Sequence, residues 1–187
     1  DDAVASLTAM NEAPSATERA DGYTQDLGSQ WVAAAVEAGA GDLVLDVCAA
    51  PGGKATAIAA TGATVVAADL QAQRVGLIAE NAQRLGSSGV LPLVADGTSA
   101  PFAPGSFQHV LVDAPCSGLG TLRRRPDARW RMLPAAIDEL GVLQQRIIDA
   151  TAPLVAPGGT LVYSVCTLLE AESTAHSVPD GFMPIAD

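Results

Sequence analysis

The segment from Leu43 to Ala60 constrains the fold more than any other part of the chain. A short apolar run gives way to small residues, then to Pro51-Gly52-Gly53, and then to a helical pattern. This order predicts a strand, a tight turn and the start of a helix. Gly52 and Gly53 can adopt backbone angles that a Cβ forbids, so a ligand can approach the main chain closely there. The helix behind them presents free N–H groups. The turn is typical of a nucleotide or nucleoside cradle, although glycine-rich turns also occur in loops that bind nothing.

The rest of the chain alternates strand-like and helix-like patterns. Besides the strand that starts at Leu43, we expect strands at 64–68, 90–94, 108–112 and 160–164, and helices at 28–38, 71–85 and 135–150. We expect Pro157-Gly158-Gly159 to form the turn before the last strand. Strands and helices that alternate at this spacing indicate βαβ units and a parallel sheet. The predicted fold class is therefore α/β, a doubly wound, Rossmann-like, mostly parallel sheet. We expect a loose lead-in over 1–21 and one domain over 22–187.

Polar residues follow the predicted strands at the points where they end. These residues are Asp46, Asp69, Asp96, Asp113 and Cys166. A single acid after a strand is usually a helix cap or a turn residue. Ligands of doubly wound sheets bind at the carboxyl ends of the strands, beside the switch point in strand order. Four acids after four strands therefore favour a binding site at this edge.

Two of these acids suit a nucleoside. Asp69 ends the second strand, where a carboxylate accepts hydrogen bonds from ribose hydroxyls in nucleoside-binding α/β folds. Asp96 is placed to accept a hydrogen bond from the exocyclic amine of an adenine. The turn lacks the GxGxxG pattern of dinucleotide sites, so a nucleoside without a pyrophosphate is favoured. S-adenosylmethionine fits that description.

Two thiols are expected at the same edge. Asp113-Ala114-Pro115-Cys116 follows one strand, and Tyr163-Ser164-Val165-Cys166 ends the next, so adjacent strands would bring the sulfurs together. A thiolate is a natural nucleophile for the electron-poor C6 of a pyrimidine. Its addition makes C5 able to attack a methyl donor, and loss of the C5 proton with expulsion of the thiolate gives a 5-methylpyrimidine. Lys54, the only lysine, suits an electrostatic role beside the donor, although most lysines are simply solvated.

The charge of the chain limits its nucleic-acid contacts. The formal net charge is −11, which argues against broad nonspecific binding to nucleic acids. Half of the basic residues nevertheless fall within nine positions, where one patch can contact phosphates: Arg123, Arg124, Arg125, Arg129 and Arg131.

The remaining composition excludes several classes of protein. The three cysteines are widely spaced without a CxxC pair, which supports neither a disulfide framework nor a zinc site, and no metal site is expected. No apolar run approaches the roughly 20 residues of a membrane span, and the first residues do not resemble a signal peptide. We expect a soluble, cytoplasmic monomer.

The ordered motifs resemble one family. VCAAPGGK, AADLQAQR, VADGT, DAPCSGLGTLRRRPDARWR and YSVCTLLEAES, with TQDLGSQ before the first strand, are similar to motifs of the RNA 5-methylcytosine methyltransferases of the NOL1/NOP2/Sun family, in particular the bacterial Sun-like (Fmu) 16S ribosomal RNA enzymes. The resemblance implies that Cys166 attacks C6, that Cys116 assists release of the product, and that Asp113 contacts the cytosine ring. It also implies an S-adenosylmethionine pocket lined by Cys48, Ala49, Ala50, Pro51, Gly52, Gly53, Lys54, Asp69, Arg74, Asp96 and Asp113. By comparison with the family, we expect the sheet to be incomplete at its C-terminal end, with Gly181-Phe182-Met183 a remnant of a last strand.

Three other functions remain open at this point. A DNA 5-methylcytosine methyltransferase uses a nucleophile in a Pro-Cys motif like Pro115-Cys116, but does not need Cys166. A noncatalytic RNA-binding subunit of the same fold would not bind S-adenosylmethionine. A dinucleotide-dependent oxidoreductase is a distant third, because no Tyr and Lys pair for hydride chemistry is visible.

Overall fold

A computed structural model describes residues 4–5, 8, 15, 17–127, 130 and 132–185. Most of the expected lead-in, together with Arg129 and Arg131, therefore lies outside the described residues. The boundary between the lead-in and the domain stays a prediction.

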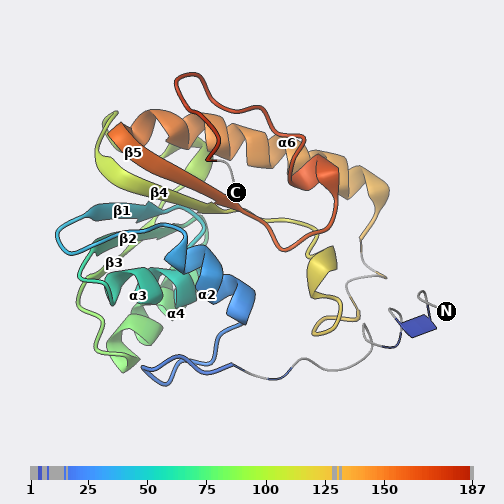
Figure 1. Ribbon diagram of the computed structural model, residues 1–187, viewed down its shortest axis with the longest axis horizontal. Coiled ribbons are helices and arrows are strands. Elements are labelled where there is room, and N and C mark those ends of the chain that lie inside the picture. Colours follow the sequence, from blue (N-terminus) through green and yellow to red (C-terminus); the bar gives the residue numbers. More distant parts are fainter. Residues whose placement is uncertain are drawn as a thin grey trace.

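The sheet has five parallel strands in the order β3-β2-β1-β4-β5 (Figure 1). The strands are β1 (Leu43–Asp46), β2 (Thr64–Asp69), β3 (Val90–Val94), β4 (Phe107–Asp113) and β5 (Val155–Ser164). After β3 the chain crosses the sheet to place β4 beside β1, and this reversal is the switch point at which such sheets bind ligands. The predicted doubly wound, parallel fold is confirmed.

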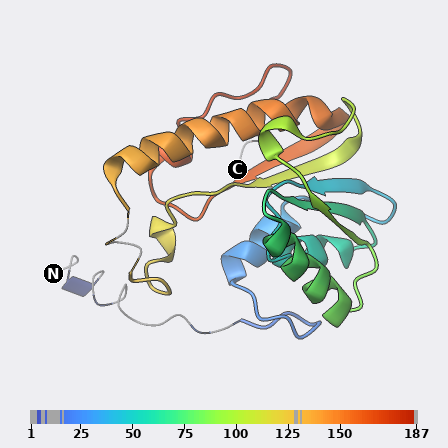
Figure 2. The same ribbon diagram turned by 180° about the vertical axis from the view of Figure 1, so that it is seen from behind.

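Helices cover both faces of the sheet (Figures 1 and 2). One face carries α2 (Leu27–Ala34), α3 (Gly53–Ala59) and α4 (Ala72–Arg84), and the other carries α6 (Pro134–Thr151). Neighbouring residues of a strand point to opposite faces. Accordingly, Val44 packs with Ile58 and Ile78 under the first layer, whereas Leu45 packs with Ile147 under α6. Burial of both faces explains why the strands are continuous apolar runs.

Two predicted boundaries were wrong. The first helix ends at Ala34 rather than at residue 38, and Glu37 has a positive φ of 54°, which no helix accommodates. Pro157-Gly158-Gly159 lies inside β5, opposite a shift in the register of β4, rather than in a turn before the strand. A Cβ at Gly159 would lie 2.3 Å from the carbonyl oxygen of Gln108, so only glycine fits against β4 there.

The segment that follows β5 forms one short 3-10 helix, η4 (Glu170–Glu172). Phe182 and Met183, expected to be a remnant of a last strand, belong to no strand. Other 3-10 helices follow β3, at η1 (Gly97–Ser99), and β4, at η2 (Leu119–Thr121), and a further one, η3 (Ala152–Leu154), precedes β5. Among the described residues, no helix has the length and apolar character needed to cross a membrane.

Candidate active site

A cavity of about 1020 Å³ lies at the carboxyl ends of the strands. Its size is at the upper end of the range for small-molecule sites. The predicted residues that line it are Cys48, Ala50, Lys54, Asp69, Arg74, Asp96, Asp113, Cys116 and Cys166. Ala49, Pro51, Gly52 and Gly53 belong to the adjoining turn but are not among the residues that line the cavity. The fold thus brings both sets of predicted residues, those for a nucleoside and those for a thiol nucleophile, to one place.

The turn between β1 and α3 needs both of its glycines. Gly52 has a φ of 98°, a left-handed conformation that side chains with a Cβ rarely adopt. A Cβ at Gly53 would lie 2.9 Å from the ring of Tyr23 and 3.1 Å from the side-chain amide of Gln25. The second glycine therefore lets the segment before α2 pack against the turn.

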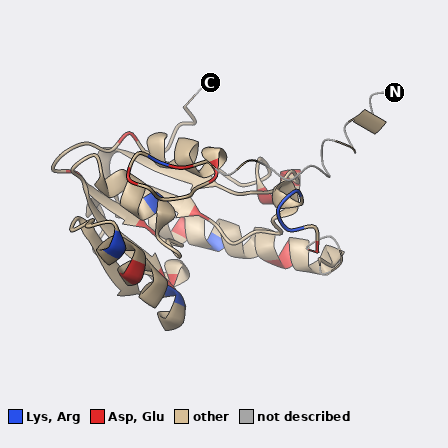
Figure 3. Ribbon diagram, turned by 90° about the horizontal axis from the view of Figure 1, so that it is seen from below, with Lys and Arg blue, Asp and Glu red and all other residues tan. Residues whose placement is uncertain are grey.

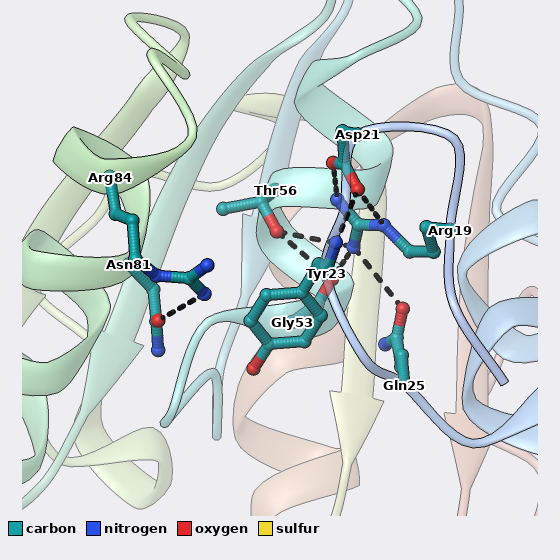
Figure 4. Close-up of polar contacts among 8 residues, drawn as sticks. All are labelled: Arg19, Asp21, Tyr23, Gln25, Gly53, Thr56, Asn81 and Arg84. Carbon is teal, nitrogen blue, oxygen red and sulfur yellow. Dashed lines mark hydrogen bonds and ion pairs between the residues drawn. The ribbon is translucent and has the colours of Figure 1, made fainter. Parts of the chain in front are cut away.

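Side chains from outside the turn take up three of its carbonyl groups. Arg74 donates to the carbonyl of Ala50 at 3.1 Å, and Asn81 donates to that of Pro51 at 2.9 Å. Arg19 donates to the carbonyl of Gly53 at 2.5 Å, while its guanidinium stacks on Tyr23 and pairs with Asp21 (Figure 4). We call residues 50–53 the turn cradle. The sequence did not point to Arg19 or Asn81, because no motif marks a donor that bonds to a carbonyl group 30 or 34 residues away.

Asp69 and Asp96 are each held by their own loops. Asp69 accepts a hydrogen bond from the backbone N–H of Gln71 at 3.1 Å and lies 3.4 Å from Arg74. Asp96 caps η1 by accepting hydrogen bonds from the N–H and the hydroxyl of Thr98, and these bonds lower its pKa. Both carboxylates line the cavity.

Asp46, at the end of β1, is 1% exposed, and neither of its carboxyl oxygens has a hydrogen-bond partner among the described residues. Burial, and then the negative charge of Asp113, raises the pKa of Asp46 to about 8, against smaller opposing effects of Lys54 and of the nearby backbone N–H of Cys48, which does not reach full hydrogen-bond geometry. Unpaired buried carboxyl groups are costly and need an explanation. Asp46 itself does not line the cavity, but the next two residues, Val47 and Cys48, do.

Lys54 and Asp113 form an ion pair across the cavity floor. The Nζ of Lys54, on the first turn of α3, lies 2.6 Å from Asp113 at the end of β4. The pair joins the start of α3 to the end of β4. Lys54 is therefore not a freely solvated lysine.

The sulfurs of Cys116 and Cys166, which we call the thiol pair, lie 3.4 Å apart. The hydrogen bond from Cys166 lowers the pKa of Cys116 to about 7, and the same contact raises the pKa of Cys166. The contact therefore favours the first ionisation of the pair and opposes the second. Cys48 differs, because burial, and then the charge of Asp46, raises the pKa of its thiol to about 12. Its sulfur is not a nucleophile in this environment.

The loop that carries Cys116 wraps closely around Cys166. The N–H of Gly120 donates to the carbonyl of Cys166 at 3.0 Å, and a Cβ at Gly120 would lie 3.0 Å from that same oxygen. Gly118 has a φ of 68°, and a Cβ there would lie 4.0 Å from the Cys166 sulfur. The glycines of this motif thus allow two loops to meet at the sulfurs.

Comparison with known proteins now adds the family. The family described as 16S rRNA methyltransferase RsmB/F matches residues 33–178. The chain belongs to the RsmB/F methyltransferase family. The family predicted from the motifs is confirmed.

Individual RsmB/F relatives agree. The chain is 45% identical to the probable ribosomal RNA small subunit methyltransferase B of Synechocystis, over 81% of this chain and 35% of the relative. It is 40% identical to ribosomal RNA small subunit methyltransferase B of Erwinia tasmaniensis, over 87% of this chain and 40% of the relative. The structure of NSun6 from Pyrococcus horikoshii, solved with SFG, has 31% identity and a TM-score of 0.71 over 81% of this chain and 40% of that chain. The chain thus spans less than half the length of these three proteins. The comparisons support S-adenosylmethionine as the cofactor of this fold.

The basic loop that follows η2 in this RsmB/F chain is partly engaged within the protein. Figure 3 shows residues 123–125 as one continuous basic stretch of the chain. Arg124 pairs with Asp26 at the start of α2, and Arg124 and Arg125 both line the cavity. Of the predicted phosphate-binding patch, the structure describes Arg123, Arg124 and Arg125.

Proposed function

We propose that this chain transfers a methyl group from S-adenosylmethionine to C5 of a cytosine in RNA, with 16S ribosomal RNA as the substrate class. The observation that carries the proposal is the thiol pair, which lies 3.4 Å apart on the wall of the same cavity that borders the turn cradle. A methyl donor alone explains the cradle. Covalent activation of a pyrimidine ring requires a thiol nucleophile, and a second thiol in contact with it can accept its proton and assist the later release.

The residues around the cavity fit S-adenosylmethionine. We assign Asp69 to the ribose hydroxyls and Asp96 to the adenine amine, with the turn cradle and Arg74 beside them. The unpaired carboxyl group of Asp46 supports a cationic ligand, because a positive charge would favour its ionised form despite its burial. When bound, S-adenosylmethionine supplies an electrophilic methyl group.

The thiols of this chain perform the remaining steps. Cys166 forms a bond from its sulfur to C6 of the cytosine, and the electron pair displaced from the C5–C6 double bond makes C5 nucleophilic. Cys116 lies within reach of the proton that Cys166 loses. After C5 has gained the methyl group, loss of the C5 proton restores the double bond and expels the Cys166 thiolate. We assign Cys116 to this release, Asp113 to contact with the ring, and Lys54, which pairs with Asp113, to an electrostatic role beside the methyl donor.

The basic loop is assigned to the RNA backbone. Arg123, Arg124 and Arg125, with Arg129 and Arg131 of the same segment, form the phosphate-binding patch in this proposal. Arg124 and Arg125 line the cavity, which supports a path for the RNA that leads to the thiols.

The test uses RNA that contains 5-fluorocytosine, because fluorine at C5 blocks the elimination and traps the covalent adduct. We expect wild-type protein and Cys116→Ala to form the adduct on this RNA and Cys166→Ala to lose it. On RNA with ordinary cytosine, Cys116→Ala should accumulate the adduct that wild-type protein releases. In the opposite assignment, Cys116 attacks C6, as in the DNA enzymes. Adducts that survive Cys166→Ala and disappear in Cys116→Ala would establish that alternative.

Two further measurements address the cofactor and the substrate. Calorimetry with S-adenosylmethionine separates an enzyme from a noncatalytic RNA-binding subunit, since the latter would show no binding. Bisulfite sequencing of total RNA with and without the gene would map the methylated nucleotide. A 16S rRNA that is unchanged by loss of the gene would contradict the proposed substrate.

A further inference from the structure

We propose that Glu172 is a positioning residue that holds the Cys116 and Cys166 loops together, so that the two sulfurs stay at reacting distance. The proposal deepens the function proposed above, on which the catalytic importance of the thiol pair rests. Glu172 lies on η4, after β5, and was not among the site residues predicted from the sequence.

The carboxylate of Glu172 is fully buried and surrounded by donors. Glu172 is 0% exposed, and Ser117 and Gln144 are also buried. One oxygen accepts hydrogen bonds from the N–H of Ser117 at 2.8 Å and from the amide of Gln144 at 3.2 Å. The other accepts from the hydroxyl of Ser117 and from that of Thr167 at 3.1 Å. Burying an unpaired carboxylate costs several kcal/mol of folding free energy, so these donors are what allow the charged Glu172 side chain to be buried at the site.

Two of the three donor residues directly follow the two cysteines in the sequence. Ser117 follows Cys116 in the loop after β4, and Thr167 follows Cys166 in the loop after β5. The hydroxyls of Ser117 and Thr167 also lie 3.0 Å apart. One carboxylate therefore joins two loops that start on different strands, one residue away from each sulfur.

The surrounding fold fixes Glu172 itself. Tyr163 of β5 donates its hydroxyl to the backbone carbonyl of Glu172 at 2.7 Å. Gln144 of α6 donates both to the carboxylate of Glu172 and to the carbonyl of Pro115 at 2.8 Å. A Cβ at Gly141 would lie 3.0 Å from the carbonyl oxygen of Ala171, so a glycine in α6 permits the close approach of η4.

The charge of Glu172 distinguishes a role in positioning the thiols from a role in activating Cys116. Burial opposes the charge of Glu172, but the hydrogen bonds from Ser117, Thr167 and Gln144 hold its pKa below the usual range. The charge is therefore present at neutral pH, and it acts to raise the pKa of Cys116 rather than to lower it. Glu172 does not activate the thiol, so its contribution to the thiol pair is geometric.

The test measures the proximity of the thiols in the whole chain, without RNA or cofactor. Diamide oxidises two thiols to a disulfide and is itself reduced to the hydrazine, so the rate of the Cys116–Cys166 disulfide reports how often the sulfurs meet. Mass spectrometry follows that disulfide, and iodoacetamide alkylation of Cys116 in separate samples reports the reactivity of a single thiol. The variants are Glu172→Ala, Glu172→Gln and, as a control with the same loss of charge on the same 3-10 helix, the exposed Glu170→Ala.

We expect Glu172→Ala to slow disulfide formation by about tenfold or more, the order of effect that follows a misplacement of reacting groups. Alkylation of Cys116 is compared at roughly pH 10, where this thiol is ionised with or without the contact to Cys166, and there it should not slow. Glu172→Gln should keep most of the disulfide rate, since its amide oxygen still accepts from Ser117, and Glu170→Ala should match wild type. Trapped adducts on 5-fluorocytosine RNA should form more slowly in Glu172→Ala, with unchanged affinity for S-adenosylmethionine.

A folded Glu172→Ala variant with the wild-type disulfide rate would overturn the proposal. If Glu172→Ala does not fold, Ser117→Ala and Thr167→Val each remove a donor from one loop, and the disulfide rate should fall in both. A wild-type rate in both would overturn the proposal as well. If the wild-type chain forms no adduct while Glu172→Ala still slows the disulfide, the proposed function fails and the positioning role of Glu172 stands.

Discussion

Two buried carboxyl groups lie on opposite sides of the switch point, and they have opposite surroundings. Glu172, behind the thiol pair, is fully buried and accepts hydrogen bonds from Ser117, Thr167 and Gln144. Asp46, at the end of β1, is 1% exposed and has no hydrogen-bond partner among the described residues. The pKa of Glu172 is accordingly lowered, whereas that of Asp46 is raised to about 8.

The difference indicates that the thiol side and the cofactor side of the cavity are supported in different ways. Behind the thiols, the carboxylate is already satisfied by the protein, which suits a structural support. At the turn cradle, Arg19, Arg74 and Asn81 donate to the backbone carbonyl groups, and none of them donates to Asp46. Asp46 is therefore the group whose state should respond to a ligand.

The largest effect should come from removing the charge of Asp46. If a cationic ligand pairs with this carboxylate, Asp46→Asn should weaken binding of S-adenosylmethionine by about tenfold to a hundredfold, the range for a hydrogen bond to a charged group. Wild-type affinity should also rise with pH up to about 8, where Asp46 ionises, and the variant should lack that rise. Titration calorimetry between pH 6 and 9 would measure both effects. The control is Asp138→Asn, an exposed acid on α6, and equal affinities in all three proteins would refute the pairing.

A smaller change is expected on the thiol side. The hydrogen bond from Cys166 lowers the pKa of Cys116 to about 7, so Cys166→Ala should move the midpoint of Cys116 alkylation up toward the ordinary value of about 8.5. At pH 7 this means alkylation about tenfold slower, because only the thiolate reacts. Cys48, whose pKa is raised to about 12, should stay unmodified in the folded protein. Mass spectrometry after timed exposure to iodoacetamide gives each rate, and an unshifted midpoint would contradict the S–H···S contact.

The pH dependence of stability should have opposite signs at the two carboxyl groups. The raised pKa of Asp46 means that the folded state binds its proton more tightly than the unfolded state, so its contribution to stability falls as the pH rises from about 4 to about 8. The lowered pKa of Glu172 means that its contribution is present above about pH 4.3 and is lost as the pH falls through its folded value. Relative to wild type, Asp46→Asn should gain stability at pH 8 over pH 5, and Glu172→Gln should lose less stability on acidification.

Thermal unfolding across this pH range would measure the two differences, at about 2–4 °C in Tm for each kcal/mol. Two variants with the same pH profile relative to wild type would show that the carboxyl groups do not differ in the way the structure indicates.

The smallest effects belong to the donors that support the turn cradle. Asn81→Ala removes the bond to the carbonyl of Pro51, and the expected cost is about 0.5–1.5 kcal/mol in the free energy of unfolding, since the carbonyl can turn to water. Affinity for S-adenosylmethionine should fall no more than severalfold, because the bonds from Arg19 and Arg74 remain. Urea unfolding and calorimetry are the measurements, with exposed Gln83→Ala on the same helix as the control. If Asn81→Ala lost as much affinity for S-adenosylmethionine as Asp46→Asn, the three donors would not share the support of the turn cradle.

The sequence by itself determined the fold and the edge at which the site lies. Apolar runs that stop at an acid predicted the strands, and 90–94 was predicted to the residue. The parallel order then required the ends of neighbouring strands to meet, which brought Cys116 and Cys166 together before any side chain was placed. These features follow from local sequence patterns and from the geometry of a parallel sheet, so they can be predicted from the sequence alone.

Only the tertiary structure decided which polar groups are partners. Glu172 reaches Ser117 across 55 residues of sequence, and Arg124 reaches Asp26 across 98, so neither contact leaves a local signal. Whether a buried carboxyl group is satisfied depends on which donors the packing brings within about 3 Å, and spacing along the chain does not encode that. The printed sequence shows Asp46 and Glu172 simply as two acids, and only their surroundings leave one carboxyl group unpaired and surround the other with donors.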